Sequence, residues 1–399
     1  MKIKQFCSFI VILISFVTYS QKLSEKAEVS VITCGPGAQL FTAFGHSAFR
    51  ISDPVLKIDK IYNYGTFNFN APNFYLNFAK GKLTYQLSTS PFSYFLRVYK
   101  YENRWVKSQV LNLKPEELQA FYDFLQNNAK PQNRDYQYDF FYDNCSTKIE
   151  AVIKTILKEK VHFNNDHITS SKTHRDLIAD YTVDQKWGKF GIDLALGSVI
   201  DRTATKDEYK FLPDYIFQAM DNATIKIGNT NEPLVLATKT FLNSNKTNSN
   251  LLFSYLTAPI SILTILSLIV GFITFKNFRN KQRSRWLDFS LHLITGIIGI
   301  AVLLLWFATD HTATYKNLNF LWAFAPNTIV AFYMLKAKLP QWIGNYHLFL
   351  LLLLGISVLI WLFKIQVYNI AIAPLLIALG LRYFYIFYTG KKVLSTSKK

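Results

Sequence analysis

Cys145 is the residue whose type and setting point most directly to chemistry. It lies in the stretch YDNCSTK at residues 142–148, and apolar residues follow it at helical spacing. A cysteine in the first turn of a helix feels the positive end of the helix dipole, which lowers the pKa of the thiol and favours the nucleophilic thiolate. Asp143 and Asn144 are expected to cap this helix, and its first N–H groups would form an oxyanion hole. Asn144 is also a candidate substrate-binding residue.

A thiol nucleophile needs a neighbouring base, and the base needs a third group that holds its tautomer. His46 is the best candidate base, because it follows Gly45 and begins a predicted strand that would fix its backbone. Asn63 lies in the next predicted strand, where asparagine is disfavoured. Its amide oxygen would accept a hydrogen bond from the imidazole. A hydrogen-bonded structural histidine and a turn asparagine remain open as alternatives.

The other cysteines and histidines of the first 250 residues have simpler interpretations. Cys34 ends a predicted strand at a Gly-Pro turn and is expected to be a small buried residue. A Cys34–Cys145 disulfide is the main alternative to catalysis, because exported proteins often pair their cysteines. His162, His167 and His174 follow the cysteine helix in a polar stretch and are expected at the surface. No two candidate ligands stand at the short intervals of zinc sites, so no metal or other cofactor is expected.

Charge and hydropathy divide the chain near residue 250. Residues 251–399 contain 14 Lys or Arg and two acidic residues, whereas residues 1–250 contain 30 Lys or Arg and 24 acidic residues. The basic residues of the second part stand between long hydrophobic runs, which is typical of membrane topology. They form no recognisable nucleic-acid-binding module. We therefore expect a membrane as a partner and no nucleic acid.

The first 20 residues resemble a secretory signal peptide, with an uncleaved anchor as the alternative. Lys2 and Lys4 precede a short apolar core at residues 9–17, and small residues precede Gln21. The rest of the chain divides into an exported soluble domain at residues 21–242, a polar linker at 243–251, a transmembrane helical domain at 252–390 and a cytoplasmic tail at 391–399.

The exported domain mixes strands and helices, which predicts an α+β class. Aromatic and β-branched runs bounded by turn residues predict strands at residues 27–33, 47–52, 61–67 and 105–113. Pro115 suits the first position of a helix that runs to Asn128, and a second helix begins at Cys145.

Five hydrophobic segments predict an all-α bundle of about five transmembrane helices. They lie near residues 252–275, 287–307, 320–335, 346–363 and 367–388, and most are close to the ~20 residues that a bilayer requires. The third is short and contains Pro326 and Asn327. Lys and Arg gather in the loops around residues 276–285 and 336–338 and in the tail, which predicts that these face the cytoplasm.

This topology predicts a multi-pass protein of the inner membrane, with the N-terminal domain in the periplasm and the C-terminus in the cytoplasm. The loop at residues 308–319 would then lie outside. Asp310 and His311 stand in it, and titratable groups at a membrane boundary are candidate functional residues. They would position a lipid headgroup or an amine, with a solvated loop as the alternative.

Several stretches, in this order, resemble the Lnb family of bacterial lipoprotein N-acyltransferases. They are ITCGPG at 32–37, FGHSAFR at 44–50, YNYGTF at 62–67, DNCST at 143–147, FLPDY at 211–215, TDH at 309–311 and NLNFLW at 317–322. A histidine strand before an Asn-Cys helix is also the order in the lecithin–retinol acyltransferase-like branch of permuted papain-like folds. The resemblance implies a permuted papain-like periplasmic domain, with Cys145 as nucleophile and His46 as base.

The reaction that this resemblance implies has two steps. The Cys145 thiolate attacks a phospholipid ester, which forms a thioester and releases a lysophospholipid. The free α-amine of a diacylated lipoprotein then takes the acyl chain. A cysteine phospholipase and an NlpC-type peptidase are the alternative enzymes, although a peptidase needs no bundle of spans. A membrane-anchored envelope binding module with bridged cysteines is the non-enzymatic alternative.

Overall fold

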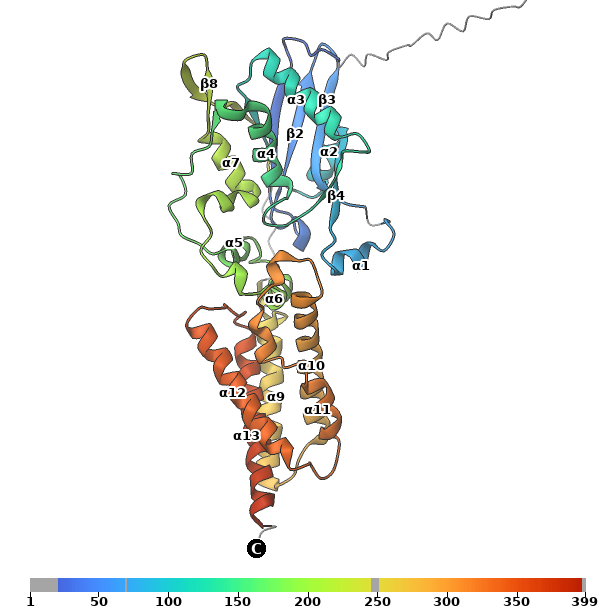
Figure 1. Ribbon diagram of the computed structural model, residues 1–399, viewed down its shortest axis with the longest axis vertical. Coiled ribbons are helices and arrows are strands. Elements are labelled where there is room, and N and C mark those ends of the chain that lie inside the picture. The colour runs from blue at the N-terminus through green and yellow to red at the C-terminus, as the bar shows by residue number, and fades with distance from the viewer. Residues whose placement is uncertain (1–20, 69, 245–250, 397–399) are drawn as a thin grey trace, which may run out of the picture.

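The computed structural model describes residues 21–68, 70–244 and 251–396, so the predicted signal peptide lies outside the described residues. A mixed α+β domain stands on one end of a helical bundle (Figure 1). The last helix, α13 (Ile372–Thr396), ends at the opposite end of the bundle. This arrangement agrees with an N-terminal domain and a C-terminus on opposite sides of a membrane.

A seven-stranded antiparallel sheet, in the order β10-β5-β1-β2-β3-β4-β6, forms the frame of the N-terminal domain. Its strands are β1 (Glu28–Cys34), β2 (His46–Asp53), β3 (Ile58–Thr66), β4 (Thr84–Pro91), β5 (Val106–Leu111), β6 (Asp135–Gln137) and β10 (Val235–Leu242). A second, small sheet contains β7 (Val161–His162), β8 (Thr224–Ile227) and β9 (Thr230–Pro233). The predicted α+β class is confirmed, and the four predicted strands correspond to β1, β2, β3 and β5.

The helices of this domain are α1 (Phe74–Ala79), α2 (Phe92–Tyr101), α3 (Pro115–Asn128), α4 (Cys145–Leu157), α5 (His174–Tyr181), α6 (Lys186–Ala195) and α7 (Pro213–Asp221). Of these, α3 and α4 begin at the predicted residues. Helices cover both faces of the sheet, because its central strands are apolar on both faces. Val31 packs with Phe121 of α3 and Ile149 of α4 on one face, and Ile32 packs with Phe92 of α2 on the other. The sheet is therefore a rigid platform for the residues at its strand ends.

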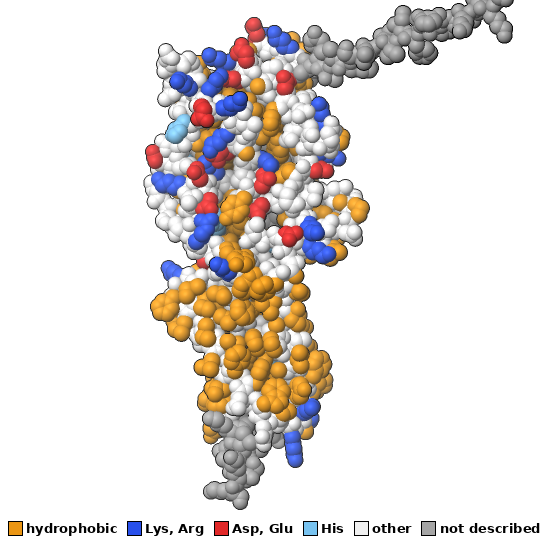
Figure 2. Space-filling model, in the orientation of Figure 1, with side chains coloured by type: hydrophobic (Ala, Val, Ile, Leu, Met, Phe, Trp, Pro, Cys, Tyr) orange, Lys and Arg blue, Asp and Glu red, His pale blue; other side chains and the backbone are white. Residues whose placement is uncertain are grey.

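The C-terminal part contains, within the described residues, four helices that are long and apolar enough to cross a membrane. They are α9 (Pro259–Asn280), α10 (Arg285–Phe307), α12 (Trp342–Leu362) and the first part of α13, Ile372–Thr389. Two shorter helices are α8 (Leu251–Leu256) and α11 (Asn327–Met334). Hydrophobic side chains cover the bundle, whereas charged side chains concentrate on the N-terminal domain (Figure 2). The bundle is a multi-span membrane domain.

The third predicted membrane segment, residues 320–335, is not one continuous helix in the structure. This segment begins in the 3-10 turn η6 (Leu318–Leu321), continues as irregular backbone and becomes helical only in α11. Pro326 lacks the N–H that would continue a helix into this position. The segment nevertheless packs along α10, where the Asn327 amide donates to the Thr295 hydroxyl at 3.0 Å.

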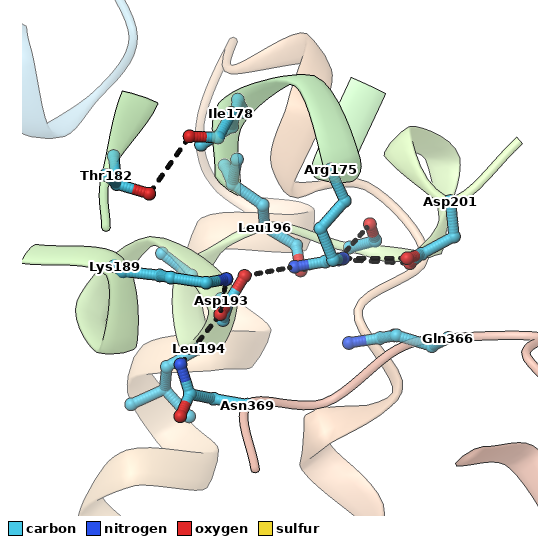
Figure 3. Close-up of polar contacts among 12 residues, drawn as sticks. Arg175, Ile178, Thr182, Lys189, Asp193, Leu194, Leu196, Asp201, Gln366 and Asn369 are labelled. Carbon is cyan, nitrogen blue, oxygen red and sulfur yellow. Dashed lines mark hydrogen bonds and ion pairs between the residues drawn. The ribbon is translucent and has the colours of Figure 1, made fainter. Parts of the chain in front are cut away.

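A buried polar network joins the N-terminal domain to the bundle (Figure 3). Arg175 of α5 pairs with Asp193 of α6 at 3.1 Å and with Asp201 at 2.7 Å. Asp193 also accepts a hydrogen bond from the Asn369 amide, which lies just before α13, at 2.8 Å. Since all three charged side chains are almost completely buried, the network fixes how the two parts meet.

The loop at residues 308–319 makes a second connection between the two parts. The Asp310 N–H donates to the Lys80 carbonyl at 2.8 Å, and the Gly197 N–H donates to the Ala313 carbonyl at 2.9 Å. This loop therefore lies on the same side of the bundle as the N-terminal domain, as the distribution of basic residues predicts.

Candidate active site

The first turn of α4 holds Cys145 in a fixed position. Asn144 is its N-cap, and the Asn144 side-chain oxygen accepts the N–H groups of Ser146 and Thr147 at 2.8 and 3.0 Å. The Asn144 amide nitrogen donates to the carbonyls of Phe140 and Phe211 at 2.7 and 2.8 Å. Asn144 is buried, and these four bonds tie the helix start to two neighbouring loops. Because the cap occupies the N–H groups of Ser146 and Thr147, they do not form the predicted oxyanion hole.

The structure brings His46, Asn63 and Cys145 together from three elements. His46 is the first residue of β2, opposite Cys34 of β1, and Asn63 lies on the adjacent strand β3. The Nε2 of His46 hydrogen-bonds the side-chain oxygen of Asn63. Because an amide oxygen only accepts, Nε2 carries a proton, which leaves Nδ1 for the hydrogen bond between His46 and the Cys145 thiol.

The electrostatics of this cluster favour a thiolate beside an imidazolium. Burial alone would raise the pKa of the Cys145 thiol, but the charge and hydrogen bond of His46, helped by the Ser47 N–H and the Ser146 hydroxyl, lower it overall. Burial alone would lower the pKa of His46, yet the Cys145 thiolate and Asn63 raise it. Each partner stabilises the charged form of the other, which is the electrostatic requirement for a nucleophilic cysteine.

Cys34 lies beside this cluster but is chemically different. Cys34 and Cys145 are both free, so the disulfide alternative does not describe this structure. Cys34 is fully buried, as expected, and burial raises the pKa of its thiol far above the ordinary range, although Arg104 and a hydrogen bond with Tyr99 oppose the shift. It therefore stays a protonated thiol.

Two tyrosines that sequence analysis missed lie beside Cys145. A Cβ added at Gly65 would lie 3.5 Å from the Cβ of Cys145 and 3.8 Å from both the Tyr136 hydroxyl and the Tyr138 ring. Burial and the charge of Cys145 raise the pKa of Tyr136, so its hydroxyl remains a neutral donor. The only feature of the sequence that could have pointed to these tyrosines is the Tyr-x-Tyr alternation at residues 136–138. Such alternation predicts a strand, but it does not predict that the strand pairs with β4.

The other predicted residues lie elsewhere. Asp310 and His311 contact α1, where the His311 Nε2 hydrogen-bonds the Phe78 carbonyl at 3.0 Å. In the described part of the chain, the hydrogen bonds of Asp310 and His311 go to α1, to its end and within their own loop, and not to His46, Asn63 or Cys145. His174 is buried against Phe141, with ring centroids 4.9 Å apart, so its predicted place at the surface is wrong. The described residues contain no group of three or more His, Cys, Asp or Glu that could hold a metal ion.

Comparison with known families agrees with both parts of this architecture. A family model described as the Lnb N-terminal periplasmic domain matches residues 16–179, and another described as the Lnb transmembrane domain matches residues 249–393. No curated protein and no solved structure matches the chain. The two models follow each other in the order of the two structural parts and together cover most of the sequence. The chain belongs to the Lnb family, with a periplasmic N-terminal domain and a multi-span membrane domain.

Proposed function

We propose that this protein transfers a fatty acyl chain from a phospholipid, through a Cys145 thioester, to the N-terminal amine of diacylated lipoproteins. The observation that carries the proposal is the half-buried Cys145–His46 pair, oriented by Asn63. Membership of the Lnb family supports a lipoprotein as the acceptor. The attached membrane domain suits two substrates that both reside in a bilayer.

In the first step the Cys145 thiolate attacks the ester carbonyl carbon of the phospholipid. The negative charge that develops on the carbonyl oxygen is stabilised by donors beside the sulfur, for which we assign the Tyr136 hydroxyl and the Cys145 N–H. When the ester C–O bond breaks, the imidazolium of His46 gives its proton to the leaving oxygen. The products are a lysophospholipid and the acyl thioester, and His46 is left neutral.

In the second step the neutral α-amine of the lipoprotein attacks the thioester carbon. His46, now neutral, accepts a proton from the amine nitrogen as the amide forms and the C–S bond breaks. The thiolate and imidazolium are regenerated, so the cycle closes without any further reactant. Asn63 keeps the ring in one tautomer through both steps, and Asn144 acts as a positioning residue through the start of α4.

The proposal extends to the fold and the location of the protein. A histidine strand followed by an Asn-Cys helix supports a permuted papain-like domain, which the observed sheet accommodates with His46 and Cys145 at its end. We place the protein in the inner membrane after removal of residues 1–20, with domain limits at 21–242 and 252–390 and a cytoplasmic tail at 391–399. Asp310 and His311 act as a link between α1 and the membrane domain.

The test is the intact mass of the purified protein after incubation first with a defined phospholipid and then with a diacylated lipopeptide. The proposal expects a fatty-acyl adduct on wild type and on Cys34→Ala, but none on Cys145→Ala. The lipopeptide should then discharge the adduct and gain one acyl chain on its amine. Discharge to water alone would identify a phospholipase, and a protein that never forms an adduct would refute the thiol mechanism.

A further inference from the structure

A continuous series of aromatic rings leads from the catalytic cysteine to helix α1. The rings of Tyr138 and Tyr85 stack with centroids 4.2 Å apart, and Tyr85 meets Phe67 edge-on at 5.1 Å. Phe67 stacks on Phe74 at 5.8 Å, and Phe74 is followed on α1 by Phe78 at 6.3 Å. We call these five residues the aromatic track. Tyr85 lies on β4, Phe74 and Phe78 lie on α1, and Phe67 and Tyr138 directly follow the strands β3 and β6 of the same sheet.

One end of the aromatic track lies at the catalytic sulfur. The Tyr138 ring and the Cβ of Cys145 both lie within 4 Å of the position that a Cβ on Gly65 would occupy. The charge of Cys145 also acts on Tyr138: after burial, it is the largest contribution that raises the pKa of this hydroxyl. An acyl group bound to the sulfur therefore begins beside the first ring of the track.

The other end lies at the membrane. The span of α10 ends at Phe307, and only a few residues later the Asp310 N–H bonds the Lys80 carbonyl at the end of α1. His311 bonds the Phe78 carbonyl, so two contacts hold α1 next to the outer end of this span. In Figure 1, α1 lies at the lower end of the N-terminal domain, above the bundle and outward from it on the side of α10.

Helix α1 presents large apolar side chains to its surroundings at this level. Tyr75, Leu76 and Phe78 are 75%, 52% and 49% exposed, and Figure 2 shows hydrophobic side chains in this region of the surface. Lys80 and Lys82 follow immediately. Aromatic residues with neighbouring lysines are typical of the interface between lipid headgroups and acyl chains. The outer leaflet is the apolar medium that lies within reach of these side chains.

We propose that the aromatic track binds the long hydrocarbon chain of the acyl donor and guides it from the outer leaflet through α1 to Cys145. This inference rests on the proposed thioester mechanism and adds the place where the acyl chain lies. A fatty acyl chain is apolar along its whole length, so it requires a surface that is apolar from the sulfur to the lipid. The track provides that surface without a gap in its ring contacts.

A groove of about 660 Å³ in the N-terminal domain, between the turn at Pro36 and the α5–α6 segment, is a poorer place for such a chain. Its lining includes Asp180, Asp184, Asp214 and Lys107. Burying a hydrocarbon chain against charged side chains would remove their water without replacing it, so this groove serves as the alternative site in the test.

The first experiment locates the chain without requiring catalysis. Cys145→Ala protein in vesicles of palmitoyl-oleoyl phosphatidylethanolamine is mixed with the same lipid carrying a diazirine at either end of its acyl chain, and photolabelled residues are identified by mass spectrometry. The proposal expects the carbonyl-end probe near Tyr138 and Tyr85, and the methyl-end probe on Phe74 and its α1 neighbours. Labelling in the groove, or labelling of the membrane helices without the track, overturns it.

The second experiment separates chain binding from chemistry. We compare the rate of Cys145 acylation by dipalmitoyl phosphatidylethanolamine with that by p-nitrophenyl acetate, in wild type and in the double variant Phe74→Ser/Phe78→Ser. The matched control is Tyr94→Ser/Tyr101→Ser, which removes two exposed rings from α2. The acylation rate of the α1 variant should fall at least about tenfold with the palmitoyl donor and stay unchanged with p-nitrophenyl acetate. Each lost apolar contact changes the preference between two substrates by a comparable factor. The acylation rate of the control variant should equal that of wild type with either ester.

The outcomes distinguish the two proposals. If p-nitrophenyl acetate fails to acylate wild-type Cys145, the thioester mechanism fails, whatever the photolabelling shows. Suppose that acetylation proceeds, but the α1 variant reacts more slowly with both esters to the same degree, or as fast as wild type with both. The proposed role of the aromatic track is then wrong, and the thioester mechanism stands. Because the helical bundle keeps every variant in the membrane, a loss restricted to the long chain does not reflect detachment. Phe74→Leu/Phe78→Leu should restore the palmitoyl rate by returning apolar surface.

Discussion

At the scale of single residues, two of the three cysteines of the chain, Cys145 and Cys34, have opposite properties. Cys145 has a histidine partner that lowers its pKa, whereas burial raises the pKa of Cys34. Both lie next to His46, since Cys34 is its partner in the β1–β2 register. Reactivity is therefore decided by which side chain hydrogen-bonds the imidazole, and Cys34 is a built-in control for every measurement on Cys145.

The pH dependence of thiol alkylation follows from these shifts. Because the Cys145 pKa is lowered, its thiolate persists as the pH falls below the ordinary thiol range, and iodoacetamide should modify it rapidly at pH 7. In His46→Gln, loss of the imidazole partner leaves the effect of burial less opposed, so the Cys145 pKa should rise and the pH profile of alkylation should shift to higher pH. Peptide mass spectrometry after timed quenching measures both sites. Labelling of Cys34 at a rate similar to that of Cys145 would contradict the assignment.

Tyr136 can be tested separately from the nucleophile. Tyr136→Phe removes the proposed donor to the carbonyl oxygen, and the rate of Cys145 acylation should fall about 10²–10³-fold. Alkylation by iodoacetamide develops no charge on a carbonyl oxygen at the sulfur, so its rate should stay near that of wild type. A parallel fall in both rates would instead mean that the tyrosine supports the thiolate itself.

At the scale of elements, the N-cap of α4 fixes the position of the Cys145 sulfur. Asn144→Ala removes two bonds to helix N–H groups and two to loop carbonyls. Loss of a cap alone costs about 0.5–2 kcal/mol of unfolding free energy. We expect lower thermal stability together with slower alkylation of Cys145.

Thr173→Ala is the matched control for the Asn144 variant. Thr173 caps α5, and its hydroxyl accepts the Asp176 N–H at 3.1 Å. Its loss should lower the stability by a similar amount but leave Cys145 alkylation unchanged. If both variants slow alkylation equally, general destabilisation and not the position of the sulfur explains the effect.

Local sequence signals were sufficient to predict the elements that bear His46, Asn63 and Cys145. Pro115 predicted the start of α3, the apolar spacing predicted α4, and aromatic runs predicted β2 and β3. Local sequence signals did not predict α1 and β6, which have six and three residues. Elements this short contain too few residues to show a helical or strand periodicity of apolar side chains. Hydropathy located the third membrane segment but not its irregular first half, because hydropathy records composition, whereas the break at Pro326 depends on the backbone. The tyrosines beside the sulfur are set by strand pairing, which sequence spacing does not record.

At the scale of the whole molecule, buried charges hold the N-terminal domain on the membrane bundle. Arg175→Met would leave Asp193 and Asp201 without their guanidinium partner. Breaking a buried ion pair costs about 3–5 kcal/mol, so the unfolding midpoint should fall. Acylation from vesicles should fall more than acylation by p-nitrophenyl acetate, since only the former needs the site to be aligned with the bilayer.

Arg202→Met provides the comparison for the Arg175 variant. Arg202 pairs with Glu208 at the surface, and exposed pairs contribute about 0–1 kcal/mol. Its thermal unfolding and both acylation rates should stay close to wild type. Equal losses from the two arginine variants would show that the buried network does not determine how the domain is oriented.

The fixed junction at Asp193 and Asn369 has a kinetic consequence. A site that is held against one leaflet meets a lipid donor and a lipid-anchored acceptor by lateral diffusion in two dimensions. Its rate then follows the mole fraction of each substrate among the surrounding lipids, and the bulk concentration has no effect. Adding an inert, non-hydrolysable ether lipid to the vesicles should slow turnover in proportion, whereas diluting the same vesicles into more buffer should leave the turnover of each enzyme molecule unchanged.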